Sequence, residues 1–351
     1  MKRALVFLGI VLMTIGPAGR AQEVKSTAPL QESSWGDETK AETTDYLPEV
    51  RLDSRWGVHH HFSEHSGRFD GDGLYINIDG KINSNLSYSF NHTLATAYGV
   101  DHLDGFAATN WLTLTYETDS WYATVGKQSM NVGNFEYDAD FLDAYYPLNS
   151  MFYNMIESWL WGVSGGWYAA EGHEIIFQFT NSPLRMDERN RFAYSLAWRG
   201  EWEHYMPYWS INSWQTDCKE YVNSLNFGNR FLLGNLTLDL EYMTRAASTT
   251  KLFKDNFNVM VAPAYKVSDR LKVLGKFGWE YVAADLPYEL AYEEYSGGDY
   301  FHYGGGVEFY PFKDVDGIRL HEIWAGNNFG DSYAYIGFKW NLGLTGVYKG
   351  R

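Results

Sequence analysis

Three consecutive histidines, His59, His60 and His61, are the residues whose type and spacing most directly suggest chemistry. Imidazole nitrogens bind transition metals, but a metal site normally takes three or four protein ligands. In a β-strand successive side chains point to opposite faces, so only His59 and His61 would share a face. Two histidines without a nearby carboxylate fall short of such a site. We therefore expect a polar strand here, and neither a bound metal nor another cofactor.

Residues 129–157 are a second candidate for chemistry, because they contain five carboxylates and no lysine or arginine. The spacing of these carboxylates matches neither a calcium-binding loop nor a helical metal motif. The chain also contains no Gly-x-Ser-x-Gly, P-loop or dinucleotide-binding pattern. We find no nucleophile–base pair either, so the sequence predicts no catalytic residue and no enzyme.

The elements that must position these residues are β-strands with one apolar and one polar face. In residues 74–94, for example, Leu74, Ile76 and Ile78 alternate with polar residues such as Asn77. The alternation recurs almost to the C-terminus, which predicts an all-β protein, a sixteen-stranded antiparallel barrel. The expected strands span 51–62, 73–82, 86–94, 109–118, 121–128, 158–168, 173–180, 191–200, 207–216, 223–233, 235–245, 255–267, 270–283, 300–311, 317–327 and 332–344.

The N-terminus fits a secretory signal peptide. Lys2 and Arg3 form a basic start, residues 4–15 are apolar, and a small-residue cleavage site precedes Gln22. We therefore expect a signal peptide over 1–21, and its apolar run is too short for a membrane-spanning helix. The residues that follow, 22–50, are acidic and without periodicity, which predicts a flexible periplasmic segment before a barrel over 51–351.

Composition narrows the class further. No later window reaches 18 consecutive apolar residues, so a secreted chain that crosses a membrane must do so as a closed barrel. The 28 Lys and Arg against 44 Asp and Glu argue against nucleic acid as a partner. Tyrosine and tryptophan are abundant, as in the aromatic girdles of membrane barrels. The single cysteine, Cys218, cannot form an internal disulfide.

The connectors between the expected strands alternate between short turns and longer polar loops. This asymmetry, with both chain ends on the short-turn side, is typical of outer-membrane barrels and places the protein in the outer membrane of a Gram-negative bacterium. The expected short turns lie at 83–85, 118–120, 169–172, 234, 268–269 and 313–316, and the long loops at 63–72, 95–108, 129–157, 181–190, 246–254 and 284–299.

The polar faces of the strands should line a water-filled lumen, and the apolar faces should contact lipid. Glu322 breaks this pattern in the fifteenth strand, so we expect a bulge or a position near the membrane interface there. The charged wall residues would give a mixed-charge lumen, or else form wall ion pairs that only stabilise it. The predicted pore-lining residues are Asn77, Asp79, Lys81, Lys127, Asp239, Glu241, Lys272, Lys276, Glu280 and Lys339.

The loop over 129–157 is the longest connector, and loops of this length usually carry function. Its aromatic rings could dock on the wall while its carboxylates face the opening, and acidic rings favour cations. The alternative is an extracellular cap with solvated carboxylates. The residues predicted to form the constriction are Phe135, Glu136, Tyr137, Asp138, Asp140, Asp143, Tyr145 and Tyr146.

Three segments in order carry a family resemblance: WYATVGKQ at 121–128, WGVSGGW at 161–167 and FQFTNSP at 177–183. With the long aromatic loop between the first two, this layout resembles the Bacteroidetes porins related to the phosphate-selective porin O/P family. The resemblance implies an outer-membrane diffusion channel, a homotrimer, with an inward loop that narrows the lumen. Phosphate-selective members rely on basic residues at the constriction, whereas the loop here is acidic. We therefore extend the channel, but not the phosphate, to this chain.

The sequence thus predicts a porin for passive diffusion of small hydrophilic solutes or ions, with outer-membrane lipid and these solutes as its partners. A channel specific for a sugar or for phosphate is one alternative. An alternative from another class is a secreted glycan-binding protein or glycoside hydrolase on a β-sandwich. Solubility without detergent would distinguish that class from a membrane barrel.

Overall fold

The structure is a computed structural model, and most of the chain from residue 47 to residue 345 can be described. The signal peptide expected over 1–21, the acidic segment up to residue 46 and Cys218 lie outside the described residues. The described residues are 47–96, 108–139, 142–145, 148–184, 190–217, 220–246, 252–253, 256–282, 298–312 and 317–345.

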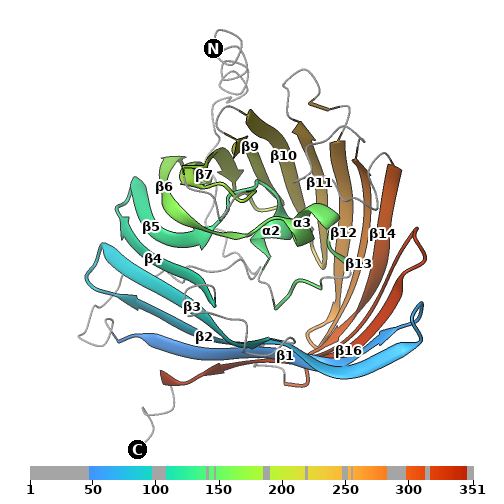
Figure 1. The fold of residues 1–351 in the computed structure, drawn as a ribbon. Helices are drawn as coiled ribbons and strands as arrows, with labels where there is room; N and C mark the ends of the chain where they lie inside the picture. The colour runs from blue at the N-terminus through green and yellow to red at the C-terminus, as the bar shows by residue number, and fades with distance from the viewer. Residues whose placement is uncertain are drawn as a thin grey trace, which may run out of the picture. The chain divides into compact units, whose positions relative to one another are not determined.

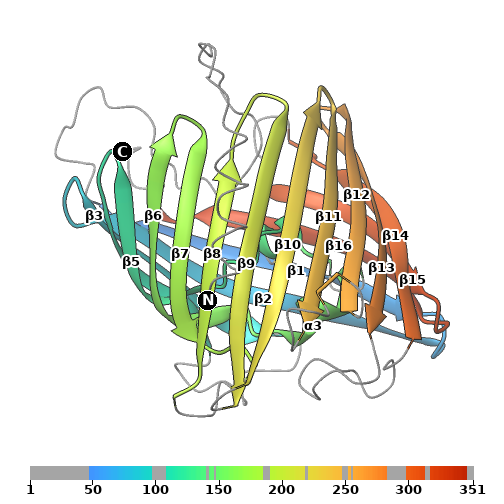
Figure 2. The same ribbon diagram turned by 90° about the horizontal axis from the view of Figure 1, so that it is seen from above.

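Sixteen antiparallel strands form one closed barrel, as Figures 1 and 2 show, and the predicted fold class is confirmed. The last strand pairs with the first, from Arg51 opposite Gly343 to His61 opposite Tyr333, so no sheet edge is left unpaired. The β-sandwich alternative is therefore wrong. The strands are β1 (Glu49–His61), β2 (Ser66–Lys81), β3 (Leu86–Thr96), β4 (Thr109–Glu117), β5 (Trp121–Ser129), β6 (Trp159–Ala170), β7 (His173–Asn181), β8 (Phe192–Gly200), β9 (Tyr205–Asp217), β10 (Glu220–Leu233), β11 (Leu236–Ala246), β12 (Asn256–Ser268), β13 (Leu271–Val282), β14 (Gly298–Phe309), β15 (Ile318–Asn327) and β16 (Ser332–Gly343).

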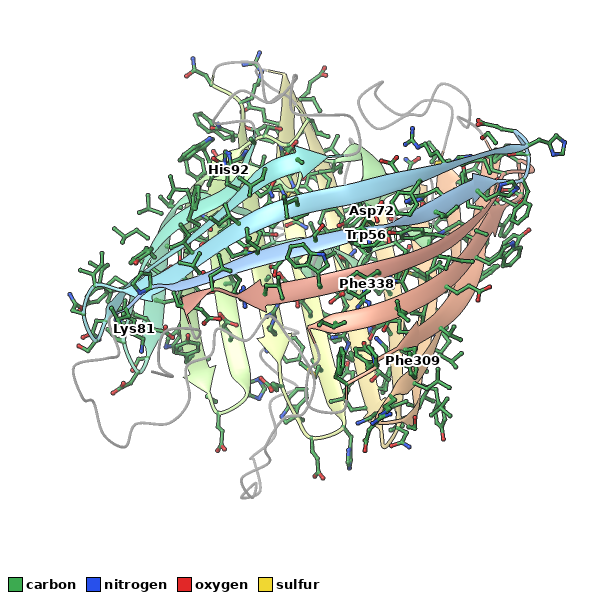
Figure 3. All side chains as sticks on the ribbon, turned by 90° about the horizontal axis from the view of Figure 1, so that it is seen from below. Trp56, Asp72, Lys81, His92, Phe309 and Phe338 are labelled. Atoms are coloured by element: carbon green, nitrogen blue, oxygen red, sulfur yellow. The ribbon has the colours of Figure 1, made fainter. Side chains whose placement is uncertain are left out.

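The outer face of the barrel is apolar. On β16, Ile336 is 60% exposed, whereas Lys339, on the opposite face of the same strand, is 7% exposed. Trp56 of β1 and Phe338 of β16 lie together on the outer surface, with ring centroids 5.5 Å apart (Figure 3). A closed sheet that exposes its apolar side chains is suited to lipid, since lipid cannot satisfy the backbone polar groups of an open edge.

Two short helices, α2 (Phe135–Asp138) and α3 (Met151–Met155), interrupt the connection between β5 and β6. In the part of the chain that can be described, no helix has both the length and the apolar character needed to cross a membrane.

The predicted loop over 63–72 is wrong. Residues 66–72 belong to β2, which pairs with β1 across a bulge between Arg55 and Trp56, and the connection is only 62–65. The sequence of this part of β2, SGRFDGD, is polar and rich in glycine, so it lacks the apolar alternation that identifies a strand. Another short connection, 328–331, joins β15 to β16 at the same end of the barrel.

The bulge predicted at Glu322 is absent, and the other expectation, a position near the membrane interface, stays a prediction. Glu322 pairs in regular register with Val307 of β14 and Ile336 of β16, and all three side chains are exposed. The exposed neighbours along its own strand, Leu320 and Trp324, are apolar. Glu322 is thus a carboxylate on the apolar outer face, which is tolerated because an acid on that face costs less than a base.

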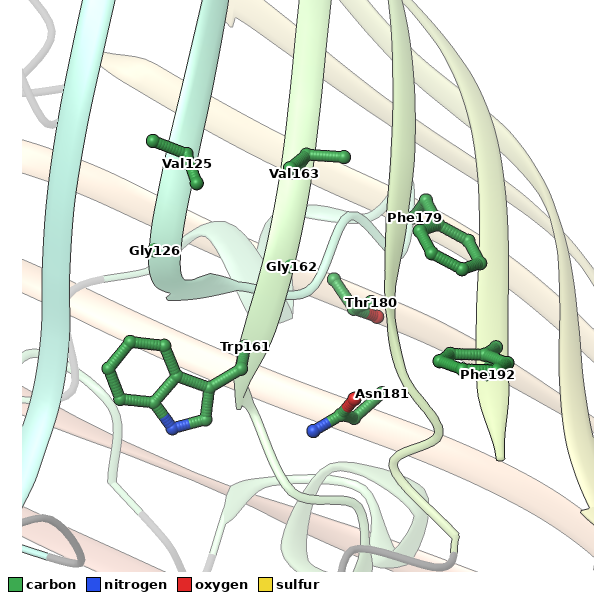
Figure 4. Close-up of a pocket in the computed structure, with 9 residues that line it drawn as sticks. All are labelled: Val125, Gly126, Trp161, Gly162, Val163, Phe179, Thr180, Asn181 and Phe192. Carbon is green, nitrogen blue, oxygen red and sulfur yellow. The ribbon is translucent and has the colours of Figure 1, made fainter. Parts of the chain in front are cut away.

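β5 bends sharply at Gly126, as Figure 4 shows. This glycine has a φ of 133°, and a Cβ at its position would overlap the carbonyl oxygen of Leu112 on β4. Only glycine adopts this conformation readily. The bend turns the end of β5 away from β4 at the point where the chain enters the connection to β6.

Candidate functional site

The connection between β5 and β6 folds into the barrel, where α2 and α3 lie inside the ring of strands (Figure 1). Its backbone is held by the inner faces of two strands. The Ser210 hydroxyl of β9 donates to the carbonyl of Val132 (2.5 Å), and the Gly228 N–H of β10 donates to the carbonyl of Gly133 (3.0 Å). The inward-folding loop predicted from the sequence is therefore confirmed, and the extracellular-cap alternative is wrong.

The start of α2 is fixed by two acceptors. Asn134 caps the helix through its side chain, which accepts from the Tyr137 N–H at 3.1 Å. The Glu241 carboxylate of β11 accepts from the Phe135 and Glu136 N–H groups, at 2.7 and 3.0 Å. The first N–H groups of a helix lack partners within it, so an anion placed there both satisfies and stabilises them.

Glu136, the second residue of α2, connects two parts of the loop with each other and with the barrel wall. Its carboxylate receives hydrogen bonds from the Ser150 N–H (2.8 Å) and from the Lys276 ammonium of β13 (2.6 Å). Lys276 also donates to the side chain of Asn149 at 3.0 Å. Burial alone would raise the pKa of Glu136, but the charge and hydrogen bond of Lys276 outweigh it and hold the pKa below its usual value.

α3 is docked in a similar way on β11 and β13. The Glu280 carboxylate of β13 accepts from the Met151 N–H at 2.6 Å. The guanidinium of Arg245 lies 3.7 Å from Glu280 and 4.3 Å from the ring centroid of Phe152. Phe152 in turn stacks on the buried Trp214 of β9 at 5.6 Å. This end of the loop is thus fixed by an apolar cluster with a buried ion pair beside it.

The middle of the loop is held by cations of β15, β16 and β1. Arg319 and Lys339 both donate to the Asp143 carboxylate at 2.5 Å. Arg55 donates to the carbonyls of Leu142 and Ala144, each at 2.8 Å. Desolvation would raise the pKa of Asp143, but the charges of Arg319 and Lys339 hold it well below its usual range.

Three carboxylates of the loop bind cations of the wall, although the side chain of Asp143 is still 42% exposed. In addition to Glu136 and Asp143, Asp138 accepts from Arg199 of β8 at 2.7 Å. Each of these three acids binds a wall cation, a pairing that the sequence did not predict, and the acidic, cation-attracting ring stays a prediction. Asp140 and Tyr146 lie outside the described residues.

The wall residues predicted to line the pore fall into two groups. Those on β11, β13 and β16 contact the loop or a neighbouring charge: Glu241, Lys276, Glu280 and Lys339 as described, Asp239 through Arg230 of β10 at 2.7 Å, and Lys272 through Glu308 of β14 at 3.1 Å. Sequence reasoning missed Arg55 and Arg245 as loop contacts. Both lie on the polar face of a strand, so the alternation was the one signal that could have indicated them.

Lys127 lies on β5 and contacts the neighbouring strand β4. It is 7% exposed and its ammonium donates to the carbonyl of Thr109 at 2.7 Å, beside the bend of β5. The bulky pair Trp111 and Trp159 also meets here, with ring centroids 4.9 Å apart. The bend thus removes from the lumen a charge that a straight strand would leave exposed.

Asn77, Asp79 and Lys81 lie on β2, away from the loop contacts. Asn77 donates to Asp53 of β1, Asn91 of β3 donates to Asn77, and Asn110 of β4 donates to Asn91, each at 2.5 Å. Four strands are therefore crossed by one chain of amides that ends on a carboxylate. The hydrogen bonds in such a chain strengthen one another, because each one polarises the next.

The histidines do not form a metal site. A carboxylate does lie beside His59, contrary to the prediction, since Asp72 is 3.3 Å from its Nε2. Asp72 also accepts hydrogen bonds from Arg55 at 2.5 Å and from Tyr335 at 2.8 Å, so its carboxylate already binds side chains of the barrel wall. Among the residues that can be described, no group of three or more His, Cys, Asp or Glu side chains is arranged to hold a metal ion.

A closed barrel of sixteen strands with a connection folded into its lumen defines the porin fold. The family model described as phosphate-selective porin O and P matches residues 62–202, and the resemblance to that family is confirmed over that range, whereas the Bacteroidetes origin stays a prediction. The comparison with curated proteins gives no match.

Several solved structures share this fold. The outer membrane channel DcaP of Acinetobacter baumannii is 9% identical, with a TM-score of 0.62 over 86% of this chain and 99% of that one. A mutant of the Rh. blastica porin is 12% identical, with a TM-score of 0.59 over 84% and 100%. OmpT of Vibrio cholerae, in a trimer form, is 12% identical, with a TM-score of 0.57 over 84% and 99%.

Proposed function

We propose that this protein is a porin of the Gram-negative outer membrane, through which small hydrophilic solutes diffuse passively. The observation that carries the proposal is the inward loop, which occupies part of a closed barrel and is fixed to the wall at both helices and at its middle. A loop held in this way narrows a lumen without sealing it, and transport then needs no chemical step.

The lumen is lined, on this proposal, by the polar faces of the strands, with Asn77, Asp79 and Lys81 on the side away from the loop. Lys276, Glu280 and Lys339 support the loop rather than meet the solute. Outer-membrane lipid contacts the apolar outer face, where side chains such as Ile336 are exposed. OmpT, a solved structure of the same fold, is described in a trimer form, and we propose a homotrimer for this protein as well.

The phosphate named in the family description is not part of the proposal. Three basic residues lie at the loop middle. Arg55 is bound to Asp72, and Arg319 and Lys339 are both already bound to Asp143. An anion would have to displace that carboxylate, so the described residues support a general channel better than an anion-selective one.

The test is single-channel recording of the detergent-purified, heat-modifiable full-length protein in a planar bilayer. Stepwise and stable conductance in KCl is expected. Folded protein that inserts but never conducts would refute the porin function. Protein that is soluble without detergent would refute the membrane location.

A further inference from the structure

The inner face of β3–β6, which we call the open wall, differs from the rest of the barrel in carrying almost no formal charge. Its half-buried polar side chains are mainly hydroxyls, among them Ser89, Thr113, Thr115, Thr124 and Ser164. They lie opposite exposed apolar residues of the same strands, such as Leu112 and Val163, and so face the lumen.

The charged residues of the open wall, Glu117 and Lys127, do not face the middle of the lumen. Glu117 is the last residue of β4, next to the short turn 118–120, and accepts from the Tyr168 hydroxyl at 2.6 Å. Lys127 is buried beside the bend of β5. The described part of this wall therefore offers a solute hydrogen bonds rather than a net field.

An aromatic pair borders this wall where β5 bends. Trp111 and Trp159 are both half-buried, and their rings are tilted by 40° with centroids 4.9 Å apart. The Trp111 indole N–H donates to the Ser89 hydroxyl at 2.8 Å, which in turn donates to Asp79 at 2.5 Å. An indole face beside fixed hydroxyl and carboxylate acceptors matches a solute that has both C–H faces and hydroxyl groups.

We propose that the channel favours uncharged polyhydroxylated solutes, that is, free sugars, and that Trp111 is a specificity-determining residue of the pore. The inference rests on the porin function proposed above. Hydroxyls of the sugar exchange water for Ser, Thr and Asn side chains of the open wall, while its apolar face passes over the indole. A charged solute of the same size gains no free counter-charge there, because Lys127 is buried and Asp79 is paired with Arg51 at 3.6 Å. The cations of the other strands are bound to the loop.

The first test compares solutes of equal size in proteoliposomes that contain the full-length protein. Glucose should enter at least about threefold faster than gluconate or protonated glucosamine at zero membrane potential, since neither charge finds a fixed counter-charge on this wall. Under a KCl gradient the reversal potential should lie near zero. Entry of gluconate or glucosamine at the rate of glucose, or a reversal potential close to that of K⁺ or Cl⁻, would overturn the inference while the porin function stands.

The second test assigns the effect to Trp111. Glucose oligomers should reduce the ion current at constant conductivity, and Trp111→Ala should raise the half-blocking concentration by about threefold to tenfold, the size of a lost aromatic contact. Trp167→Ala is the matched control, because Trp167 is 56% exposed on the outer face. Equal blocking in the wild type and Trp111→Ala would refute the role of Trp111. Absence of any conductance would instead refute the porin function itself.

Discussion

The open wall of β3–β6 and the loop-bearing wall of β8–β16 and β1 use polar side chains for different purposes. On the loop-bearing wall, cations such as Lys276, Arg319 and Lys339 bind carboxylates of the loop. On the open wall, amides and hydroxyls bind one another, as Asn110 of β4 binds Asn91 of β3. This chain continues through Asn77 of β2 to Asp53 of β1. The difference shows that a charged side chain on a strand of a pore need not interact with the solute. On the loop-bearing wall, such charges are neutralised by ion pairs within the protein.

Deletion of residues 135–153 should have the largest effect on conductance, because it removes the loop that binds the cations of the loop-bearing wall. Loss of both helices frees the cations of the loop-bearing wall, widens the lumen and raises the single-channel conductance severalfold. The measurement is conductance in a planar bilayer together with exclusion of sugars of increasing size. Heat-modifiable migration would show that the shortened protein still folds, and an unchanged conductance in folded protein would contradict a constriction by this loop.

Lys276→Met should destabilise the protein by about 3–5 kcal/mol, since it leaves the carboxylate of Glu136 buried without its cation. The side chain of Glu136 is 1% exposed, so water cannot replace the lost partner. The matched control is Arg51→Met, whose ion pair with Asp79 is 40% and 39% exposed and spans 3.6 Å. That loss should cost less than about 1 kcal/mol. Urea unfolding of both variants in lipid measures the difference, and equal losses would contradict the contrast between the walls.

Asp143→Asn should shift the reversal potential toward anion selectivity. Its carboxylate is 42% exposed and binds Arg319 and Lys339. Its neutralisation therefore adds one net positive charge to the lumen and leaves Lys339 without this counter-charge, while Arg319 keeps Glu308 at 3.3 Å. Glu322→Gln makes the same change of charge on the outer face and should leave the reversal potential unchanged. A shift of equal size in both variants would show that the effect is not local to the loop.

The smallest expected effect is the pH dependence of the stability that the contact of Asp143 with Arg319 and Lys339 provides. Because the folded pKa of Asp143 lies below its unfolded value, the carboxylate stabilises the fold fully above the unfolded pKa, about 4. That contribution is lost as the pH falls through the lowered, folded pKa. The stability difference between the wild type and Asp143→Asn should therefore be constant from pH 7 to about 5 and shrink only in stronger acid. A difference that already shrinks between pH 7 and 5 would mean that Asp143 is not held by both cations.

Strand alternation was sufficient to predict the fold, because a barrel wall imposes the same two-residue period on every strand. It failed for residues 66–72, where glycine and aspartate replace the apolar face, and for Glu322, where the ladder accepts a carboxylate without a bulge. The loop was identified from its length and composition, but not the direction of its carboxylates. That direction depends on cations such as Arg55, which lies about 90 residues from its partners, and no local pattern records such a pairing.

The pairing of β1 with β16 determines when the barrel can close during folding. Ser54 pairs with Trp340, and Val58 with Ile336, so the first and last strands of the wall hold each other across almost the whole sequence. Contacts of such separation form late and slowly. Until residues 332–343 have emerged and reached β1, every earlier strand belongs to a sheet with two free edges, which is prone to aggregation. The barrel can therefore close only after β16 has reached β1.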